Sequence, residues 1–383
     1  MTRSVLCWCV LSLFATGVFA DEQKPQTEFV FNLYRTVVKD KANDNATVSP
    51  FGVQQVLDLL RHGAAGETRT EIEQVLDYTE SVKWKTLADG PLTIAASLWA
   101  QQGHPFLPEF LQTAKENFGA TIEHADFARN SGEAVKRINA WCSEKTNEKI
   151  PVLFDKLDPM TRLVLVGAIH FAADWKTPFN EKATRDNDFT LLDGTKAKTK
   201  LMAQTGQMKY GESAGTLALE LPYKDDGYAM LLLLPENPAD FAKWEAEMTL
   251  EKWTALRSAM KVEQVDMRMP RFTMETNIPL NDTLKQLGMP TAFGDRSDFS
   301  KIDGSKNLFV SEALQKTFVK VDETGTEAVA ATGIAIVVRS MPLQVKIFRA
   351  DRPFLYAIVK GDTILFLGRF VKPIADVPYI PAP

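Results

Sequence analysis

The segment from Glu323 to Pro342 constrains the fold of this chain more than any other stretch. Its central part, from Ala328 to Val338, holds no proline, no charge and a single Gly333, and its small residues give way to β-branched ones. This is the composition of a buried strand. The segment nevertheless ends in an Arg-Ser-Met-Pro sequence that is typical of an exposed loop. An ordinary core strand is the simpler interpretation of the composition alone, but the flanking residues favour a strand that waits outside its sheet.

Alternation along this segment separates its side chains into two faces. One face holds no charged residue and consists of Thr326, Ala328, Ala330, Thr332, Ile334 and Ile336. The other face holds Glu327, Val329, Ala331, Gly333 and Ala335, and its one charge lies at the end of the strand, where it can still reach water. A proline would remove a ladder hydrogen bond, and none occurs before Pro342. The segment can therefore join a sheet without burying a charge.

The amino terminus has the pattern of a secretory signal peptide over residues 1–20. It carries Arg3, then an apolar run from Val5 to Phe19, and it ends in a Val-Phe-Ala cleavage pattern. The run is too short to cross a bilayer comfortably, so a retained membrane anchor is the less favoured alternative. Cleavage after Ala20 would leave 383 − 20 = 363 residues. We expect a secreted protein with no membrane partner, extracellular or, if the host is a Gram-negative bacterium, periplasmic.

Cysteine usage leaves no internal disulfide in the mature chain. Of the three cysteines, Cys7 and Cys9 lie in the signal peptide and Cys142 remains. Cys142 follows Trp141 in an amphipathic helical stretch, and apart from Lys145 nothing basic adjoins it to stabilise a thiolate. We expect a buried core cysteine and a fold that is held by packing.

Charge and histidine placement argue against nucleic-acid and metal partners. The net charge is −5, and acidic and basic residues are interleaved without a block of five or six like charges. The histidines lack the spacing of metal ligands such as H-E-x-x-H, and no cysteine pair is available for zinc. We expect no nucleic-acid partner, no metal and no cofactor.

A short motif, Gly211-Glu-Ser-Ala-Gly215, matches the G-x-S-x-G nucleophile elbow of hydrolases. That elbow needs a strand before it, a helix after it and a base histidine downstream. Here a strand pattern follows, from Thr216 to Tyr223, and all four histidines precede Ser213. They are His62, His104, His124 and His170. A hairpin turn is the better interpretation, and the sequence predicts no catalytic site and no enzyme.

Hydrophobic patterning predicts an α+β domain. Helical spacing covers 53–60, 71–76, 107–118 and 133–143, and strand patterns cover 92–100, 162–171 and 228–234. Helices and strands do not alternate strictly, which favours large antiparallel or mixed sheets over a doubly wound parallel sheet. No internal repeat is visible. Residues 374–383 are rich in proline and predict an extended C-terminal tail.

Ordered landmarks from Phe29 to Pro373 resemble the serpin family. Around the loop they are Lys320-Val-Asp-Glu323, Thr324-Gly-Thr-Glu-Ala328 and Phe348-Arg-Ala-Asp-Arg-Pro-Phe354. Elsewhere they are Asn45-Ala-Thr-Val-Ser-Pro50, Gly63-Ala-Ala-Gly-Glu-Thr68, Ile138-Asn-Ala-Trp141, Thr146, Lys149-Ile150, Phe171 to Trp175, Pro178-Phe179, Leu221-Pro-Tyr223, Pro270-Arg-Phe272, Leu287-Gly-Met289 and Leu365-Phe-Leu-Gly-Arg369. Each landmark is weak alone, but the ordered set is specific.

The resemblance implies one serpin domain over residues 21–373, with helices around three β-sheets and an exposed reactive-centre loop at about 323–342. In serpins the reactive bond lies sixteen residues beyond the hinge glutamate, which here gives Arg339-Ser340. The implied hinge and inserting residues are Glu323, Gly325, Thr326, Glu327, Ala328, Ala330, Ala331 and Thr332. After cleavage, the family's loop inserts into the large sheet and traps the protease as a covalent acyl complex.

Arginine at the reactive bond implies a trypsin-like serine protease as the partner, because its guanidinium can pair with the carboxylate at the base of that protease's specificity pocket. We therefore expect a secreted, monomeric inhibitor. The alternative is a serpin-fold carrier or chaperone whose loop is cleaved as a simple substrate. Hinge composition favours the inhibitor, since non-inhibitory relatives often carry bulky, charged or proline residues there.

The resemblance also points to residues that govern opening of the central sheet. They are Ser49, Gly52, Gly167, His170, Trp175 and Gln315. Family members usually carry serine, asparagine and histidine at positions 52, 167 and 315, so this chain departs at all three. His170 is either a replacement polar contact or an ordinary buried histidine. The short segment 77–91, with Lys83 and Lys85 as its only bases, argues against activation by heparin.

Overall fold

The structure, a computed structural model, describes residues 27–78, 84, 90–103, 105–326 and 345–374. The strands in this part of the chain are β1 (Ala46–Val48), β2 (Leu92–Gln101), β3 (Thr121–Ala125), β4 (Leu163–Phe171), β5 (Ala173–Asp174), β6 (Arg185–Thr190), β7 (Lys196–Ser213), β8 (Thr216–Pro222), β9 (Tyr228–Pro235), β10 (Lys261–Pro270), β11 (Phe272–Pro279), β12 (Glu312–Val321), β13 (Gly325–Thr326), β14 (Lys346–Arg349), β15 (Phe354–Lys360) and β16 (Thr363–Phe370). The longer helices are α1 (Phe29–Val38), α2 (Pro50–Gly63), α3 (Gly66–Leu76), α5 (Phe127–Lys145) and α7 (Leu250–Ala259). Shorter ones are α4 (Pro108–Thr113), α6 (Phe241–Ala246), α8 (Asn281–Leu287) and α9 (Ser300–Asp303).

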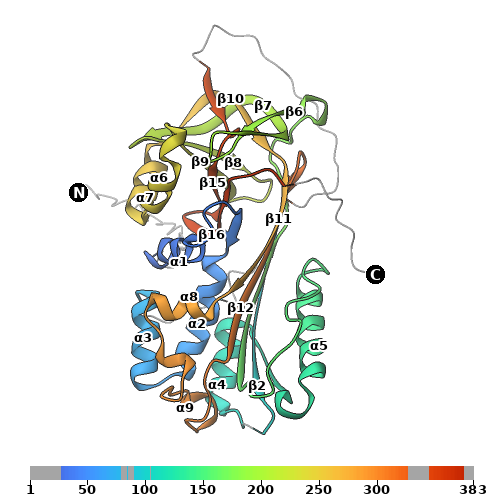
Figure 1. Ribbon diagram of the computed structural model, residues 1–383, viewed down its shortest axis with the longest axis vertical. Helices are drawn as coiled ribbons and strands as arrows, with labels where there is room; N and C mark the ends of the chain where they lie inside the picture. Colours follow the sequence, from blue (N-terminus) through green and yellow to red (C-terminus); the bar gives the residue numbers. More distant parts are fainter. Residues whose placement is uncertain (1–26, 79–83, 85–89, 104, 327–344, 375–383) are drawn as a thin grey trace, which may run out of the picture.

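Within the described residues the strands form two mixed sheets (Figure 1). A nine-stranded sheet has the order β1-β16-β15-β9-β8-β7-β10-β14, with β6 paired to β7. A seven-stranded sheet has the order β3-β2-β4-β12-β13-β5, with β11 paired to β12. Three pairs are parallel, namely β2 with β3, β4 with β12 and β10 with β14. The predicted α+β class with large mixed sheets is therefore confirmed.

Of the three β-sheets that the resemblance implies, hydrogen bonding joins two into the nine-stranded sheet, and β7 is the strand that joins them. This strand is 18 residues long. Its first part pairs with β6, its middle with β10 and its last part with β8. One continuous ladder therefore joins what would otherwise be two sheets.

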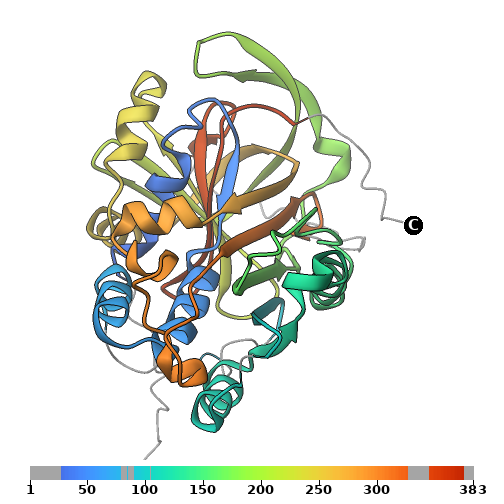
Figure 2. The ribbon, with the colours of Figure 1, turned by 60° about the horizontal axis from the view of Figure 1, so that its bottom comes forward.

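The centre of the seven-stranded sheet is buried on both faces, because helices cover it from two sides (Figure 2). Leu163, Leu165 and Ile169 of β4 belong to a core shared with α2, whereas Val164 and Val166 belong to a second core shared with α5. All nine residues of β4 are buried, which explains its continuous apolar sequence. This central strand is therefore held by packing on both sides.

Sequence signals explain the ends of the two helices that cover this sheet. Pro50 occupies the first turn of α2, and the Ser49 hydroxyl accepts a hydrogen bond from the Gly52 N–H at 3.2 Å. Asp126 caps α5 in the same way through the Arg129 N–H. Both helices begin where a capping side chain satisfies a free backbone donor.

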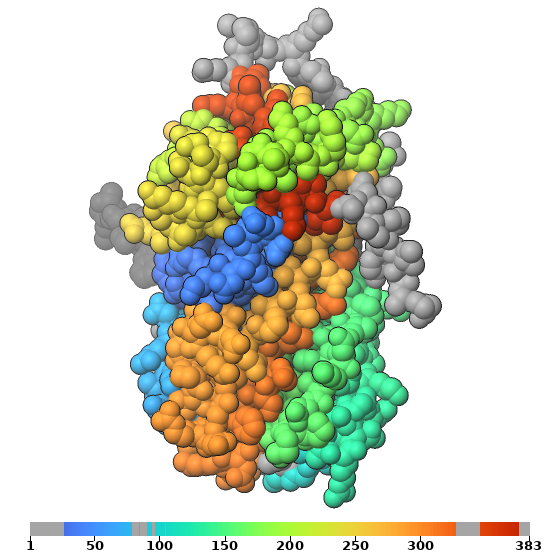
Figure 3. Space-filling model, in the orientation of Figure 1, coloured from blue at the N-terminus to red at the C-terminus, as the bar shows by residue number. Residues whose placement is uncertain are grey.

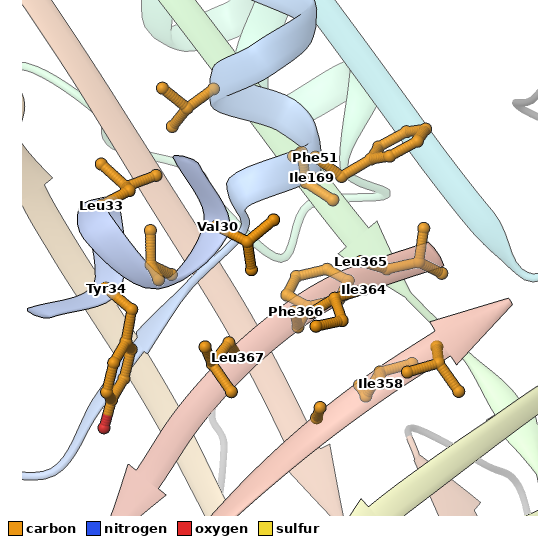
Figure 4. Packing of buried hydrophobic residues seen from close by; sticks show 14 of the residues in the cluster. Val30, Leu33, Tyr34, Phe51, Ile169, Ile358, Ile364, Leu365, Phe366 and Leu367 are labelled. Atoms are coloured by element: carbon orange, nitrogen blue, oxygen red, sulfur yellow. The ribbon is translucent and has the colours of Figure 1, made fainter. Parts of the chain in front are cut away.

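The main core continues between the two sheets. Figure 4 shows α1 and α2 over β16 and β15, with side chains such as Leu33, Phe51 and Phe366 packed together. No helix among the described residues is long and apolar enough to span a membrane.

Most predicted elements are confirmed with small shifts of their ends. The largest difference lies at 107–118, where α4 ends after two turns and Ala114–Phe118 continues as a π-helical turn. The hairpin interpretation of Gly211–Gly215 is confirmed, because β7 and β8 pair antiparallel and Ala214 and Gly215 both have positive φ at the turn. The signal peptide, most of the C-terminal tail and the bases of segment 77–91 lie outside the described residues.

Candidate functional site

The hinge of the predicted loop forms the short strand β13. Thr326 pairs antiparallel with Val321 of β12 on one side and with Ala173 of β5 on the other. Thr326 is completely buried, and Gly325 is buried beside it. β13 therefore already occupies the space between two strands at one end of the seven-stranded sheet.

Gly325 is required at this position by the close approach of the neighbouring strand. A Cβ atom on Gly325 would lie 2.2 Å from the carbonyl oxygen of Ala173 and 2.7 Å from the Cα of Asp174. Both atoms belong to backbone and cannot move aside easily. Only glycine allows β13 to pair with β5 here.

Asp322 shapes the turn that leads from β12 into β13. Its Oδ1 accepts hydrogen bonds from the Thr324 N–H at 2.9 Å and from the Thr324 hydroxyl at 2.6 Å. Its Oδ2 pairs with Lys320 Nζ at 3.0 Å. Desolvation alone would raise the pKa of Asp322, but the hydrogen bonds from Thr324 and Lys320 together hold that pKa below its ordinary value. The carboxylate therefore stays ionised while it holds the turn.

Aromatic side chains clamp the hinge from the other side. Trp175 donates from its backbone N–H to the Thr324 carbonyl and from Nε1 to the Asp322 carbonyl, each at 2.9 Å. Its ring stacks on Tyr223 with centroids 4.5 Å apart. The Tyr223 hydroxyl lies 2.6 Å from the Thr326 hydroxyl. Burial raises the pKa of Tyr223, so this hydroxyl remains neutral.

Glu323 is buried and is held by residues from two segments. Its carboxylate accepts a hydrogen bond from the Thr184 hydroxyl at 2.7 Å and lies 3.9 Å from Arg271 Nη1. Its carbonyl accepts from the Phe179 N–H at 2.8 Å. The hinge glutamate therefore ties the end of β12 to segments before β6 and at the start of β11.

Below the hinge, β4 and β12 pair directly with each other. Residues 312–318 pair in parallel with 164–170, an offset of 312 − 164 = 148. The two partners of Thr326 have the same offset, since 321 − 173 = 148. The two strands thus keep one register from the closed part of the sheet to the part that β13 has already entered.

Gln315 fastens this closed part of the sheet to α2. Its Oε1 accepts from the Ser49 N–H and its Nε2 donates to the Ser49 carbonyl, each at 2.8 Å. The Ser49 hydroxyl in turn donates to the Leu365 carbonyl at 2.6 Å. The amide of Gln315 therefore makes a double hydrogen bond to backbone where family members usually carry a histidine.

Gly52 and Gly167 make the surroundings of Gln315 apolar. A Cβ on Gly52 would lie 1.7 Å from Ile169 Cδ1, so the isoleucine fills the space that a larger residue would need. A Cβ on Gly167 would lie 3.4 Å from Val56 Cγ2. The absence of side chains at 52 and 167 is thus matched by aliphatic packing rather than by other polar groups.

His170 lies across the sheet from Gln315. Alternation along β4 places Gly167 and Ile169 toward α2, whereas Ala168 and His170 face α5. His170 is 4% exposed. The interpretation of His170 as a buried histidine fits this placement better than that of a substitute for the usual polar groups around Gln315.

The structure brings together part of the predicted site. Glu323, Gly325, Thr326 and Trp175 meet at the hinge, and Ser49, Gly52, Gly167 and Gln315 meet lower in the same sheet. Glu327, Ala328, Ala330, Ala331, Thr332, Arg339 and Ser340 lie outside the described residues. Thr184, Tyr223 and Arg271 also hold the hinge, and these roles were not predicted from the sequence. Tyr223 and Arg271 belong to quoted landmarks, which was the available signal, whereas Thr184 gave none.

The described residues offer little to catalysis or metal binding. No group of three or more His, Cys, Asp or Glu side chains among them is arranged to hold a metal ion. Cys142 is fully buried, as predicted, and burial raises the pKa of its thiol to about 12, which makes it inert as a nucleophile. The site is built to hold and receive a strand.

Comparison with known proteins gives one consistent family. Residues 24–373 match the family model described as "Serpin (serine protease inhibitor)". The human leukocyte elastase inhibitor is 34% identical over 374 residues, which covers 91% of this chain and 98% of the relative. The structure of tengpin, a thermophilic serpin in its native state, superposes with a TM-score of 0.82 at 29% identity and covers 90% of this chain and 92% of tengpin. Human thyroxine-binding globulin in complex with thyroxine has a TM-score of 0.82 at 27% identity, with 90% and 96% covered.

These matches span nearly the whole described chain, and they agree with the hinge strand and the two-sided central sheet. The family is one of serine protease inhibitors and not of enzymes. This chain belongs to the serpin family.

Proposed function

We propose that this protein is a secreted inhibitor that traps trypsin-like serine proteases as a covalent acyl complex after cleavage at Arg339-Ser340. The protease serine Oγ attacks the carbonyl carbon of Arg339, the peptide bond to Ser340 breaks, and the amine of Ser340 leaves with a proton. Arg339 is then an ester on the protease. Water would hydrolyse that ester and release both proteins unless the loop distorts the protease first.

The common register of β4, β12 and β13 is the observation that carries this proposal. Antiparallel partners move in opposite directions, so six residues after Thr326 correspond to six residues before Val321 and Ala173. Continuing β13 would place Thr332 between Gln315 and Gly167. The pairing of β13 with β12 leads to Gln315, and its pairing with β5 leads to Gly167. These two residues already pair with each other. The sheet must separate to accept the strand, but β4 and β12 need not slide.

Hydrogen-bond geometry favours the inserted arrangement. At present β4 and β12 form one parallel ladder. A strand that continues β13 would run antiparallel to both and would replace this ladder with two antiparallel ones, which are slightly more stable per residue. Insertion thus adds backbone hydrogen bonds and improves their type.

The side chains of the segment also suit the space. Thr326 pairs with Val321, which belongs to the core shared with α2. Alternate residues up to Ile336 would therefore face that core, and none of them is charged. Glu327 would face the α5 side close to the open end of the sheet.

The choice of target rests on Arg339. A guanidinium binds bidentately to a carboxylate, which is the recognition chemistry of a trypsin-like specificity pocket. The relative named as an elastase inhibitor differs in its printed target, so membership of the family does not by itself supply the protease class. Val338 before Arg339 is bulkier than the residues that narrowly selective proteases tend to accept, which favours a tolerant enzyme.

The test is incubation of residues 21–383 with trypsin, followed by denaturing electrophoresis and mass determination of the released fragment. A denaturant-stable adduct with cleavage after Arg339 is expected. Arg339→Ala is the control and should lose the adduct with trypsin. Clean cleavage without an adduct would instead support a carrier or chaperone whose loop is a simple substrate.

A further inference from the structure

The outer face of β10 and β14 carries apolar side chains that no other element of the described chain covers. Val262 and Ile347 are each 63% exposed, and Val345, just before β14, is 46% exposed. Asp266 pairs with Ile347 in the parallel ladder, so the two side chains lie on the same face. Val262 lies four residues before Asp266 on β10, and alternation therefore places it on that face too. Five other large apolar side chains in the described chain are also exposed, but they are spread over other elements, namely Leu111, Val152, Met160, Leu192 and Ile374.

Most polar groups beside these apolar residues are paired, and Arg268, farther along the same face of β10, is half-buried. Gln264, between Val262 and Asp266 on the face, accepts a hydrogen bond from Gln207 of β7 at 2.8 Å. Asp266 forms an ion pair with Arg349 of β14. Lys209, which pairs with Val262 in the ladder, forms an ion pair with Glu220 at 2.8 Å. The face therefore presents aliphatic and amide groups at its centre and paired charges around them.

This arrangement matches the anatomy of a protein interface, in which the centre is depleted of free charge and the polar groups lie at the rim. Single exposed aliphatic residues need no explanation. Two on neighbouring strands, with a third at the entry to one of them, form a contiguous strip. β14 is also the edge strand of the nine-stranded sheet and lies at the top of the molecule in Figure 1, where its orange-red atoms reach the surface in Figure 3.

The position of this strip in the chain limits what can cover it. Val345 lies five residues after Ser340, and five extended residues span at most about 18 Å. A specific protein partner covers roughly 800 Å² on each side, or a disc of about 16 Å radius. A protease bound at Arg339-Ser340 is therefore large enough, and tethered closely enough, to reach β14.

We propose that the strip formed by Val262, Val345 and Ile347 is a second docking surface for the target protease, and that it contacts the rim of the protease beside the subsites for residues after the cleaved bond. The proposal rests on the proposed function, because Arg339-Ser340 sets where the protease sits. It commits to a neutral or apolar protease rim, since the strip itself is aliphatic and the charges of Asp266 and Lys209 beside it are paired.

Such a surface acts only on the encounter. Cleavage separates Ser340 from Arg339, and the acylated protease leaves with the amino-terminal part of the loop. Contacts at β10 and β14 are lost at that point, so they cannot affect the competition between insertion and hydrolysis. The strip should therefore raise the rate of association and leave the number of inhibitor molecules consumed per protease unchanged.

The experiment compares the wild-type protein with the double variant Val262→Thr/Ile347→Thr. Threonine keeps strand propensity but replaces a methyl group of Val262 and the ethyl group of Ile347 by a hydroxyl. The single variant Val262→Thr distinguishes an effect of the docking surface from an effect on the loop, because β10 does not follow the loop in sequence. Val152→Thr, another exposed valine in the α5–β4 connection, is the matched control. Thermal unfolding midpoints establish that all variants are folded.

Two measurements are made with trypsin, namely the second-order rate constant of inhibition and the stoichiometry. Affinity for trypsin with its catalytic serine replaced by alanine supplies a third that involves no acylation. The double variant should lower the rate constant and the affinity by roughly tenfold at unchanged stoichiometry, with part of the effect in Val262→Thr and none in Val152→Thr. Wild-type rates and affinities in the double variant would overturn the docking surface, even with the adduct formed normally. Absence of an adduct with the wild-type protein would overturn the proposed function itself, a separate outcome.

Discussion

Different interactions stabilise the hinge end of the seven-stranded sheet and the part of the sheet where β4 and β12 pair directly. At the hinge the strands are already apart, and β13 is fixed between them by Asp322, Trp175, Tyr223 and Thr184 through hydrogen bonds to backbone and side chains. Lower in the same sheet the strands pair directly over α2. There the contacts are aliphatic, and one amide, that of Gln315, fastens β12 to the start of α2.

The two regions have different effects: the hinge positions the entering strand, and the middle of the sheet resists the separation of β4 from β12. Directional hydrogen bonds at the hinge hold Thr326 at one register and so set where a strand would enter. Apolar packing below has no direction and can re-form around another strand, whereas the double hydrogen bond of Gln315 must break or rearrange if β12 moves away from α2. The hinge thus determines register, and the middle of the sheet sets the barrier to opening.

Replacing Thr326 by arginine should have the largest effect. The site is fully buried beside Tyr223, and an unpaired charge there would cost several kcal/mol. Each 1.4 kcal/mol or so of added insertion barrier costs about tenfold in the competition with hydrolysis. We expect cleavage by trypsin without an adduct, measured by denaturing electrophoresis. Thr326→Ser retains the hydroxyl and should retain the adduct. An arginine variant that still formed the adduct would show that a charge at this buried position of β13 does not impede insertion.

Gln315→Leu probes the middle of the sheet. It removes both hydrogen bonds to Ser49 and leaves a buried N–H without its acceptor. The free energy of unfolding should fall by about 2–3 kcal/mol, measured by urea denaturation. Gln264→Leu, which breaks an exposed amide pair instead, should change it by less than about 1 kcal/mol. Equal effects of the two substitutions would remove the distinction between the two regions.

Gly52→Ser restores a residue that family members usually carry but meets Ile169. The new Cβ would lie 1.7 Å from Ile169 Cδ1, and overpacking of this kind costs about 1–3 kcal/mol. Adding Ile169→Val removes the colliding methyl group and should recover part of the loss, a coupling measurable by urea denaturation of both single variants and the double variant. Gly132→Ser, where a Cβ meets no atom within 4 Å, is the control. Independent effects at 52 and 169 would contradict the compensation.

The smallest effect is the pH dependence of the hinge turn. The folded pKa of Asp322 is lowered, so its stabilisation is present above the unfolded value of about 3.9 and is lost as pH falls through the folded pKa. Asp322→Asn keeps an acceptor for Thr324 but loses the charge that pairs with Lys320. The wild-type protein should be more stable than this variant near pH 7, and the difference should vanish once the pH has fallen below the folded pKa of Asp322. Asp225→Asn, at an exposed position, is the control. A difference in stability between the wild-type protein and Asp322→Asn that persisted at low pH would argue against the ion pair.

Sequence patterns predicted local structure best where one physical signal dominated. The continuous apolar run of β4 and the turn between β7 and β8 followed from composition and spacing. The joining of two sheets through β7 was not predicted, because it depends on the partners of this strand along its 18 residues and not on its own sequence. The site was predicted through the landmarks around Glu323 and Trp175. Thr184 was missed since it lies 139 residues from its partner Glu323 and carries no pattern.

By itself the sequence determined the properties that belong to single segments. It made residues 328–338 free of proline and of charge, and it gave the loop one uncharged face. Tertiary structure decided the shared offset that would bring Thr332 between Gln315 and Gly167, the convergence of Thr184 and Arg271 on Glu323, and the filling of the space at Gly52 by Ile169. Composition and periodicity report what a segment can do in any environment. Register and packing are relations between segments more than a hundred residues apart, and these exist only when the chain is folded.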